Sequence, residues 1–138
     1  MSEKNPSKAT GSLHIMEKTN SNLKPSVFTP VHKVGIPFLY ETYLSLVEQT
    51  RDDWEWVILL NGGAKKKDIH PDIRLDSRVK IQVTHDDVGA IHNYIGRLKK
   101  EACNFCSNEV LIELDCDDLL VPKAIEEIMN VASDSSNS

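Results

Sequence analysis

VLIELDCDD, residues 110–118, is an almost wholly apolar run that ends in three carboxylates within four positions. An apolar run of this length, bounded by polar residues, is typical of a strand in a parallel sheet that is covered on both faces. In open parallel sheets, ligands bind beyond the carboxyl ends of the strands. The stretch therefore predicts a buried strand that places Asp115, Asp117 and Asp118 at the ligand-binding edge of a sheet.

The three acids have two interpretations. Crowded carboxylates repel one another, a divalent cation relieves that repulsion, and oxygen ligands favour Mg²⁺, Mn²⁺ or Ca²⁺ over Zn²⁺. Alternatively, the acids form a solvated turn that caps the next helix, since Asp is favoured in turns and caps. An EF-hand loop that began at Asp115 does not fit, because Leu119 and Leu120 stand where it needs an oxygen ligand and a glycine.

Composition limits the possible partners. A chain of 138 residues with 40% hydrophobic content can form one domain with a core, and its net charge of −5 disfavours a nucleic-acid or anionic-membrane surface. No run approaches the ~20 apolar residues that span a bilayer, and the N-terminus has no signal-peptide core. Three cysteines, an odd number, indicate free thiols in a reducing compartment. We therefore expect a soluble, cytoplasmic protein that binds neither nucleic acid nor a membrane.

The two ends of the chain are polar. Residues 1–24 are rich in Ser, Lys, Asn and Thr, and their weak apolar cluster at 13–16 is too small to offset the entropy of ordering. Residues 132–138 form a Ser-rich stretch of the same kind. Both ends are expected to be disordered, which leaves residues 25–131 as the folded domain.

Strands and amphipathic helices alternate along the rest of the chain. Strands are expected at 26–30, 54–60, 79–83 and 110–114, and helices at 36–47, 89–102 and from about 122. The prediction is an α/β fold of three layers, with a mainly parallel four-stranded sheet in the order 3-2-1-4. That order would bring Pro30, Asn61 and Asp115 together where the direction of the chain across the sheet reverses.

Two further features have a plain and a functional interpretation. His92, near the start of a predicted helix, could meet an anion there, although a lone histidine more often packs or faces solvent. Cys103 and Cys106 have the spacing of a metal or redox pair, but no second pair exists to complete a zinc site. Two ordinary thiols are the preferred interpretation.

Five motifs resemble, in the same order, those of the donor-binding half of family 2 glycosyltransferases, which have the Rossmann-like GT-A fold. The first two are SVFTP (26–30), similar to an opening strand that ends in proline, and LSLVEQT (44–50), similar to a Ser-Leu-x-x-Gln-Thr helix end. The third is WVILLNGG (56–63), similar to a strand that ends in Asp-Asp-Gly-Ser or Asp-Asn-Gly-Ser. The last two are His92-Asn93, similar to an Arg-Asn, and LDCDDLLVP (114–122), similar to an Asp-x-Asp-Asp segment with a trailing proline. The resemblance covers residues 26 to about 128.

The resemblance implies a glycosyltransferase that uses a nucleoside-diphosphate sugar donor and transfers the sugar to a hydroxyl acceptor. It also implies that Asp117, with Asp115 near the ribose, holds Mn²⁺ or Mg²⁺, which stabilises the charge of the departing diphosphate. The nucleotide-sugar site would be lined by Thr29, Pro30, His32, Asn61, Gly62, His92, Asn93, Asp115 and Cys116.

The sequence also departs from the family pattern. Leu60 stands at the first acid of the Asp-Asp-Gly-Ser motif, and His32-Lys33 replace an aromatic-Asn pair. The identity of the nucleobase in the donor therefore stays open. The family continues into an acceptor-binding half that supplies the catalytic base, whereas this sequence ends one helix after the acids. We therefore expect a second protomer or a partner chain to complete the site. The alternative is a non-catalytic nucleotide-binding or protein-interaction module.

Overall fold

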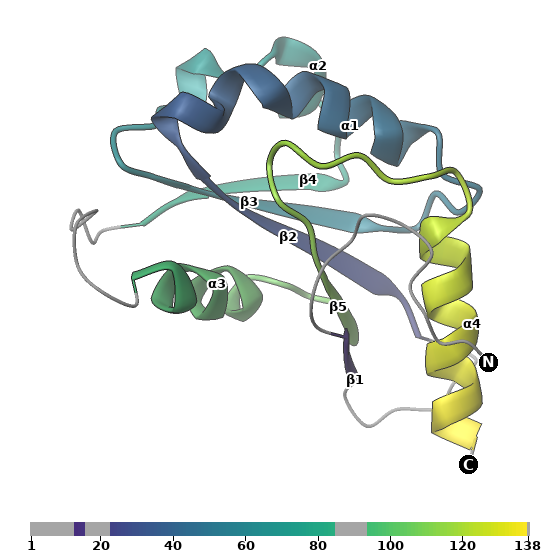
Figure 1. Cartoon of the computed structure of the whole chain (residues 1–138). Helices are drawn as coiled ribbons and strands as arrows, with labels where there is room; N and C mark the ends of the chain where they lie inside the picture. Colours follow the sequence, from purple (N-terminus) through teal and green to yellow (C-terminus); the bar gives the residue numbers. More distant parts are fainter. Residues whose placement is uncertain (1–12, 16–22, 85–93, 138) are drawn as a thin grey trace.

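The computed structural model describes residues 13–15, 23–84 and 94–137, which form a five-stranded sheet with helices on both faces (Figure 1). The strands are β1 (Leu13–Ile15), β2 (Pro25–His32), β3 (Glu55–Asn61), β4 (Val79–Val83) and β5 (Val110–Glu113). The helices are η2 (Lys33–Phe38), α1 (Leu39–Val47), η3 (Lys66–Asp68), α2 (Pro71–Arg74), α3 (Tyr94–Asn104) and α4 (Ala124–Asn137). Within these described residues, no helix has the length and apolar character needed to cross a bilayer.

The four longer strands confirm the predicted sheet. β2 pairs in parallel with both β3 and β5, and β3 pairs in parallel with β4. The order β4-β3-β2-β5 is the predicted order 3-2-1-4. The chain moves outward from β2 through β3 to β4 and then returns to the other side of β2. The direction of the chain therefore reverses beside β2, the position where open sheets of this kind bind ligands.

Both polar ends contain regular structure that the sequence analysis did not predict. Leu13–Ile15, within the stretch expected to be disordered, form β1 and pair antiparallel with β5. Pairing here gives backbone partners to an edge that β5 would otherwise leave open. At the other end, α4 continues to Asn137 instead of stopping near residue 131, and Ala132 is fully buried. Composition alone therefore underestimated what an open strand edge and a core contact can order.

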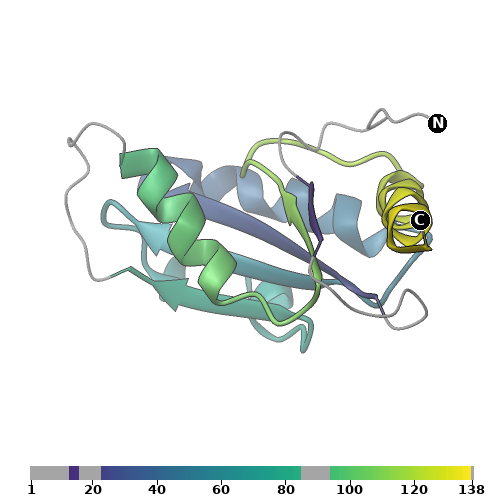
Figure 2. The ribbon, with the colours of Figure 1, turned by 90° about the horizontal axis from the view of Figure 1, so that it is seen from below.

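α1 and α2 lie on one face of the sheet and α3 lies on the other (Figures 1 and 2). The larger core, which also includes residues of α1 and α4, takes Ile58 and Leu60 from β3. Val57 and Leu59 of the same strand belong to a smaller cluster with α3. The strand is apolar at all four positions because both of its faces are covered. Alternation then directs the next residue, Asn61, toward the α3 face.

Alternation along β2 sorts the predicted site residues by face. Phe28 belongs to the α3 cluster, so Pro30 and His32 share the α3 face with it. His32 is registered with Asn61 of the neighbouring strand. The carboxyl ends of β2 and β3 thus present three of the predicted site residues on the same side of the sheet.

Candidate functional site at the carboxyl edge

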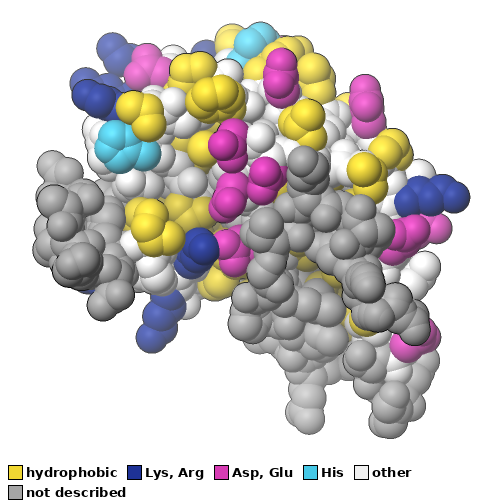
Figure 3. All heavy atoms as spheres, viewed as in Figure 1, with side chains coloured by type: hydrophobic (Ala, Val, Ile, Leu, Met, Phe, Trp, Pro, Cys, Tyr) yellow, Lys and Arg dark blue, Asp and Glu magenta, His cyan; other side chains and the backbone are white. Residues whose placement is uncertain are grey.

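The predicted donor-site residues gather at the carboxyl edge of the sheet. β2 lies between β3 and β5, so Asn61 and Asp115 are at the same edge, one strand apart, with Pro30 and His32 between them. Figure 3 shows acidic side chains grouped in the middle of this face of the molecule, beside the loop that follows β5. The hypothesis of a shared site required Asn61 and Asp115 to lie at one edge, and the structure meets that requirement.

Asp115 to Asp118 form a tight turn directly after β5, in which the Asp118 N–H donates to the Asp115 carbonyl over 3.1 Å. Asp115 and Asp117 are exposed, whereas Asp118 is half-buried. Partial burial of the carboxylate raises the pKa of Asp115, and the charges of Asp118 and Glu113 raise it further, while Lys99 opposes them. The turn therefore concentrates negative charge that a cation would relieve.

Thr42 of α1 holds this turn in place through its side-chain hydroxyl. The residue is fully buried, and its Oγ1 lies 2.7 Å from the carbonyl oxygen of Cys116 and 3.0 Å from that of Asp118. The sequence analysis did not single out Thr42. The available signal was a hydroxyl side chain on the face of α1 that Leu39 and Leu46 bury in the core. A polar residue on an otherwise apolar face needs a hydrogen-bond partner, and here that partner is the acid turn.

Gln49 holds the loop that connects the acid turn to α4. Its side-chain Nε2 donates to the carbonyl of Val121 over 2.7 Å, and its Oε1 accepts from the N–H of Ile125, at the start of α4, over 2.9 Å. The N–H of Thr50 donates to the Pro122 carbonyl over 2.9 Å. The helix-end motif at 44–50 therefore has a positioning role, because it fixes the part of this loop that leads into α4.

Cys116 points away from solvent, toward η2. A Cβ placed on Gly35 would lie 2.6 Å from the Cys116 Sγ, which is closer than side chains pack. Burial raises the pKa of the Cys116 thiol, and the neighbouring Asp117 and Asp115 charges add to that rise. The thiol is therefore a neutral packing group, and a direct role in nucleotide binding stays a prediction.

His32 and Gly62 are packed against each other at the ends of β2 and β3. Gly62 has a φ of 58°, and a Cβ there would lie 2.0 Å from the His32 Cδ2. Glycine is therefore required on two counts, because a side chain would be strained and would overlap the ring. The His32 Nδ1 accepts from the Val34 N–H over 3.3 Å, so the proton of the neutral imidazole resides on Nε2.

The placement of Thr29 corrects one prediction. Thr29 was expected to line the nucleoside pocket, but it is fully buried and its Oγ1 accepts a hydrogen bond from the Trp56 Nε1 over 2.8 Å. The physical reason is alternation, since Pro30 faces α3 and its neighbour Thr29 must face the α1 core. Thr29 is thus a core residue beneath the site.

Asn61 combines burial with a missing partner. Only 7% of the residue is exposed, and within the described residues its side-chain amide makes no hydrogen bond. Its backbone carbonyl accepts from the Ala64 N–H over 3.0 Å, which closes the turn that contains Gly62. Among the described side chains, Trp54 Nε1 is the one polar atom that is both sealed from solvent and without a partner, so the Asn61 amide atoms still reach solvent. The amide can therefore offer a donor and an acceptor to a ligand at this edge.

Two predicted site residues, His92 and Asn93, lie outside the described residues. Their role in the site stays a prediction. α3, the helix that they precede in the sequence, covers the face of the sheet to which Pro30, His32 and Asn61 belong.

The acid turn suits an open cation site. Across residues 13–15, 23–84 and 94–137, no three His, Cys, Asp or Glu side chains come together as a closed metal centre. Mg²⁺ commonly takes one or two protein carboxylates and completes its coordination with substrate phosphates and water. The exposed oxygen atoms of Asp115 and Asp117, on a turn fixed by Thr42, fit that kind of site.

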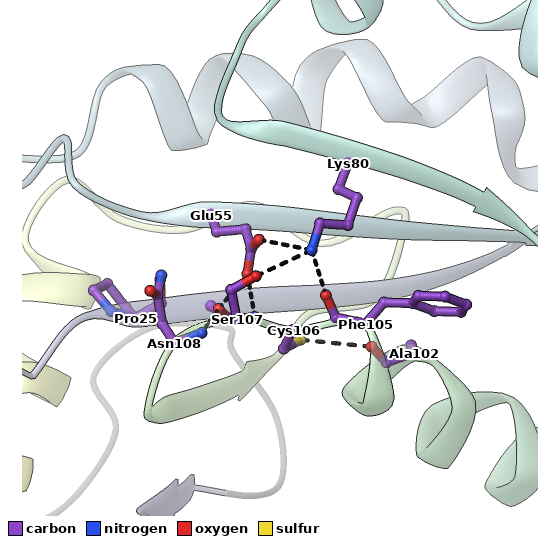
Figure 4. A network of polar contacts seen from close by, with 9 residues as sticks. Pro25, Glu55, Lys80, Ala102, Phe105, Cys106, Ser107 and Asn108 are labelled. Carbon is purple, nitrogen blue, oxygen red and sulfur yellow. Dashed lines mark hydrogen bonds and ion pairs between the residues drawn. The ribbon is translucent and has the colours of Figure 1, made fainter. Parts of the chain in front are cut away.

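A separate polar network closes the opposite, amino edge of the sheet (Figure 4). The Glu55 carboxylate accepts from the Ser26 Oγ (2.6 Å) and the Ser107 N–H (2.8 Å) and pairs with the Lys80 Nζ (3.2 Å). A cavity of about 370 Å³ lies beside it and is lined, within the described part of the chain, by none of the predicted site residues. The network joins β2, β3 and β4 to the loop before β5, so its role is structural.

Comparisons with known proteins agree with this geometry. The family model described as glycosyl transferase family 2 matches residues 26–137. Two solved structures have a similar fold: S. aureus TarS 1–349 in complex with UDP (TM-score 0.67, 17% identity, 81% of this chain and 32% of that chain) and the same protein in complex with UDP-GlcNAc (TM-score 0.62, 19% identity, 80% and 30%). No curated protein matches. The chain therefore spans about a third of the length of these solved structures.

Proposed function

Because the chain belongs to glycosyl transferase family 2, we propose that it binds a nucleoside-diphosphate sugar at the carboxyl edge and takes part in transferring the sugar to a hydroxyl acceptor. One observation carries the proposal. Side chains from β2 and β3 share the α3 face at the edge where the acid turn begins, and one of them, Asn61, is a mostly buried amide whose polar atoms still reach solvent. Such an amide is available to pair with a ligand at this edge.

The nucleoside is proposed to lie over Pro30, His32 and Asn61. The Asn61 amide offers both a donor and an acceptor, and a uracil edge presents the complementary carbonyl and N–H groups. The proton on the His32 Nε2 supplies a second donor nearby. UDP is the first candidate nucleotide, because the TarS structures of similar fold are complexes with UDP and UDP-GlcNAc.

Asp117, together with Asp115, is proposed to hold Mn²⁺ or Mg²⁺ beside the diphosphate. When bound, the cation supplies positive charge that stabilises the departing diphosphate. The chain's own residues hold the carboxylates in place: Thr42 fixes the turn and Gln49 fixes the loop after it. Groups fixed before the reaction need no reorganisation as charge develops, which is what electrostatic stabilisation requires.

We assign donor binding to these residues and no base for the acceptor. Inverting transfer needs a base within hydrogen-bond reach of the acceptor hydroxyl, and the recognised motifs supply none. The chain also spans only about a third of the TarS structures. In this proposal a second protomer or a partner chain supplies the base, or the leaving phosphate itself acts as the base in a retaining transfer. The alternative is a nucleotide-binding module that uses the same edge without turnover.

Thermal unfolding with UDP, GDP, dTDP and CDP, each with and without Mn²⁺, tests donor binding. A nucleotide at about a hundred times its dissociation constant stabilises the folded chain by about 2.7 kcal/mol, an easily measured shift. We expect UDP with Mn²⁺ to give the largest shift and Asp117→Ala to abolish the Mn²⁺ contribution. Glu127→Ala, an exposed acid of α4, is the matched control. Absence of a shift with all four nucleotides would contradict the proposal.

Turnover of a donor sugar separates an enzyme from a binding module. The purified chain is incubated with the donor and metal, with and without an acceptor panel, and products are followed by NMR. Formation of a glycoside identifies a transferase, and its anomeric configuration distinguishes inversion from retention. Binding without turnover, at any protein concentration tested, excludes transfer by the chain and its own oligomers, and leaves the binding module or a base supplied by a partner chain.

A further inference from the structure

Glu113, the last residue of β5, is a carboxylate in a strand that is otherwise apolar. Only 10% of its side chain is exposed, and its Oε2 lies 2.5 Å from the Nζ of Lys99, a residue of α3. Leu111, two positions earlier, packs in the α3 cluster, so alternation directs Glu113 toward the same helix. The sequence analysis counted Glu113 as part of the apolar run and gave it no role.

Packing alone does not account for this ion pair. Glu113 is the buried member of the pair, whereas 36% of the Lys99 side chain is exposed. Replacing a buried charge and its partner by apolar residues of similar volume is often neutral or stabilising. The neighbouring α3 cluster contains Phe28, Leu98 and Ala102, which an apolar side chain at position 113 would join. A charge pair at this position therefore calls for an explanation other than stability.

The pair stands directly before the acid turn. Asp115 follows Glu113 by two residues, at the start of the turn after β5, and Lys99 contacts the Glu113 carboxylate from α3. Lys99 thus places a positive charge close to the site proposed for the diphosphate, and Glu113 partly cancels it.

We propose that Lys99 and Glu113 form a charge-balancing pair that sets the relative affinity of the acid turn for a divalent cation and for a nucleoside diphosphate. The inference rests on the proposed function. Both members are positioning residues, because they act through Asp115 and not on the reacting atoms. Their charges cancel, so the turn keeps enough negative potential for the cation while a lysine ammonium remains near the diphosphate.

Removing the Glu113 charge and removing the Lys99 charge should change the affinities for the cation and for the diphosphate in opposite directions. Without the Glu113 charge, Lys99 is uncompensated, which weakens cation binding and strengthens metal-free binding of a diphosphate. Without the Lys99 charge, both effects change sign. A pair that merely ties α3 to β5 would make the two variants change in the same direction, because either one breaks the tie.

The experiment measures two dissociation constants of the full chain by calorimetry, that of Mn²⁺ alone and that of UDP in the presence of EDTA. For Glu113→Gln we expect Mn²⁺ to bind about five- to tenfold more weakly and UDP several-fold more tightly, as one unit charge in this environment implies. Lys99→Met should show the reverse. The double variant Glu113→Leu/Lys99→Met should approach the parent, and Lys100→Met, an exposed neighbour on α3, should equal it.

Circular dichroism of each variant records whether it is folded. If Lys99→Met does not fold, Glu113→Gln and the double variant still decide the result. Parallel losses of both ligands in Glu113→Gln, or no change in either constant, would overturn the inference while leaving the proposed function intact. If the parent binds neither Mn²⁺ nor UDP, the proposed function is wrong and the inference falls with it.

Discussion

The carboxylates at the two edges of the sheet have pKa values that are shifted in opposite directions. At the amino edge, burial alone would raise the pKa of Glu55, but hydrogen bonds from Ser107 and Ser26 and from Lys80 outweigh it and lower the pKa. At the carboxyl edge, burial and neighbouring carboxylates raise the pKa of Asp115. The native fold thus favours the charged form of one carboxylate and disfavours that of the other.

The difference indicates where a ligand is needed. A polar group whose partners are all within the chain contributes to stability and has little left to offer a ligand. A group that is left unpaired, or held among like charges, costs stability and gains most when a ligand supplies the missing partner. Asn61 and the acid turn are of the second kind, and Glu55 is of the first.

Glu55→Ala gives the largest expected effect on stability. The change leaves Lys80 without its carboxylate and removes the acceptor of the Ser26 Oγ and the Ser107 N–H. We expect a loss of about 3 kcal/mol in the free energy of unfolding, measured by urea denaturation. UDP affinity in Mn²⁺, measured where the variant is folded, should stay within a factor of two. A large loss of affinity at unchanged stability would reverse the roles assigned to the two edges.

Asp117→Ala should do the converse at the carboxyl edge. The side chain is exposed, so the free energy of unfolding should change by less than about 0.5 kcal/mol. Loss of an anionic ligand to a hard cation should weaken UDP binding in Mn²⁺ on the order of 50-fold, or about 2.3 kcal/mol. Calorimetry checks this, with Cys116→Ser as a control that is expected to be nearly silent. Equal affinity of Asp117→Ala and the parent would contradict the metal assignment.

Asp76 tests whether a fully paired carboxylate stabilises the fold through its charge. The Arg78 guanidinium, with a further hydrogen bond from Tyr43, lowers the pKa of Asp76 to about 2 from its ordinary 3.8. The unfolded chain therefore binds this proton first as pH falls. The stabilisation is complete above about pH 4 and is lost between pH 4 and pH 2, by about 2 kcal/mol.

Urea denaturation of the parent and Asp76→Asn at pH 7, 4 and 2 measures that contribution. The difference in unfolding free energy between the two proteins should shrink by about 2 kcal/mol from pH 7 to pH 2. A difference that is independent of pH would show that the Asp76 charge has no part in stability.

The sequence predicted the sheet well because its strands are covered on both faces. Runs such as 56–60 and 110–114 leave few alternatives to a buried parallel strand, and the order of elements then limits the topology. β1 was missed because its order depends on pairing with β5, a contact between distant parts of the sequence. The length of α4 was missed for a similar reason, since Ala132 is ordered by the core and not by its polar neighbours.

Within the site, sequence motifs identified positions better than they identified roles. The acids and the Asn61-Gly62 turn could be found because their residue types are unusual at the end of an apolar strand. Thr29 was misassigned because a motif does not say which face of the strand a residue occupies. Thr42 and Gln49 were not assigned, since their partners are backbone carbonyls and an N–H that the sequence does not bring near them.

The smallest expected effect, at Asn61, tests the comparison most directly, because one substitution should move stability and binding in opposite directions. Leucine has the same branched shape as asparagine, although it is larger, and it has no polar group to desolvate, so Asn61→Leu should raise the free energy of unfolding by up to about 1 kcal/mol. The same change removes the amide proposed to pair with the uracil ring, and UDP affinity should fall about tenfold. Gln82→Leu, an amide at the registered position of β4 beside Leu59, is the matched control and should leave UDP affinity unchanged. If Asn61→Leu lowers stability, the amide has a structural partner and its assignment to the base is wrong. If stability rises while affinity for all four nucleotides stays the same, the buried amide is unpaired for a reason other than donor binding.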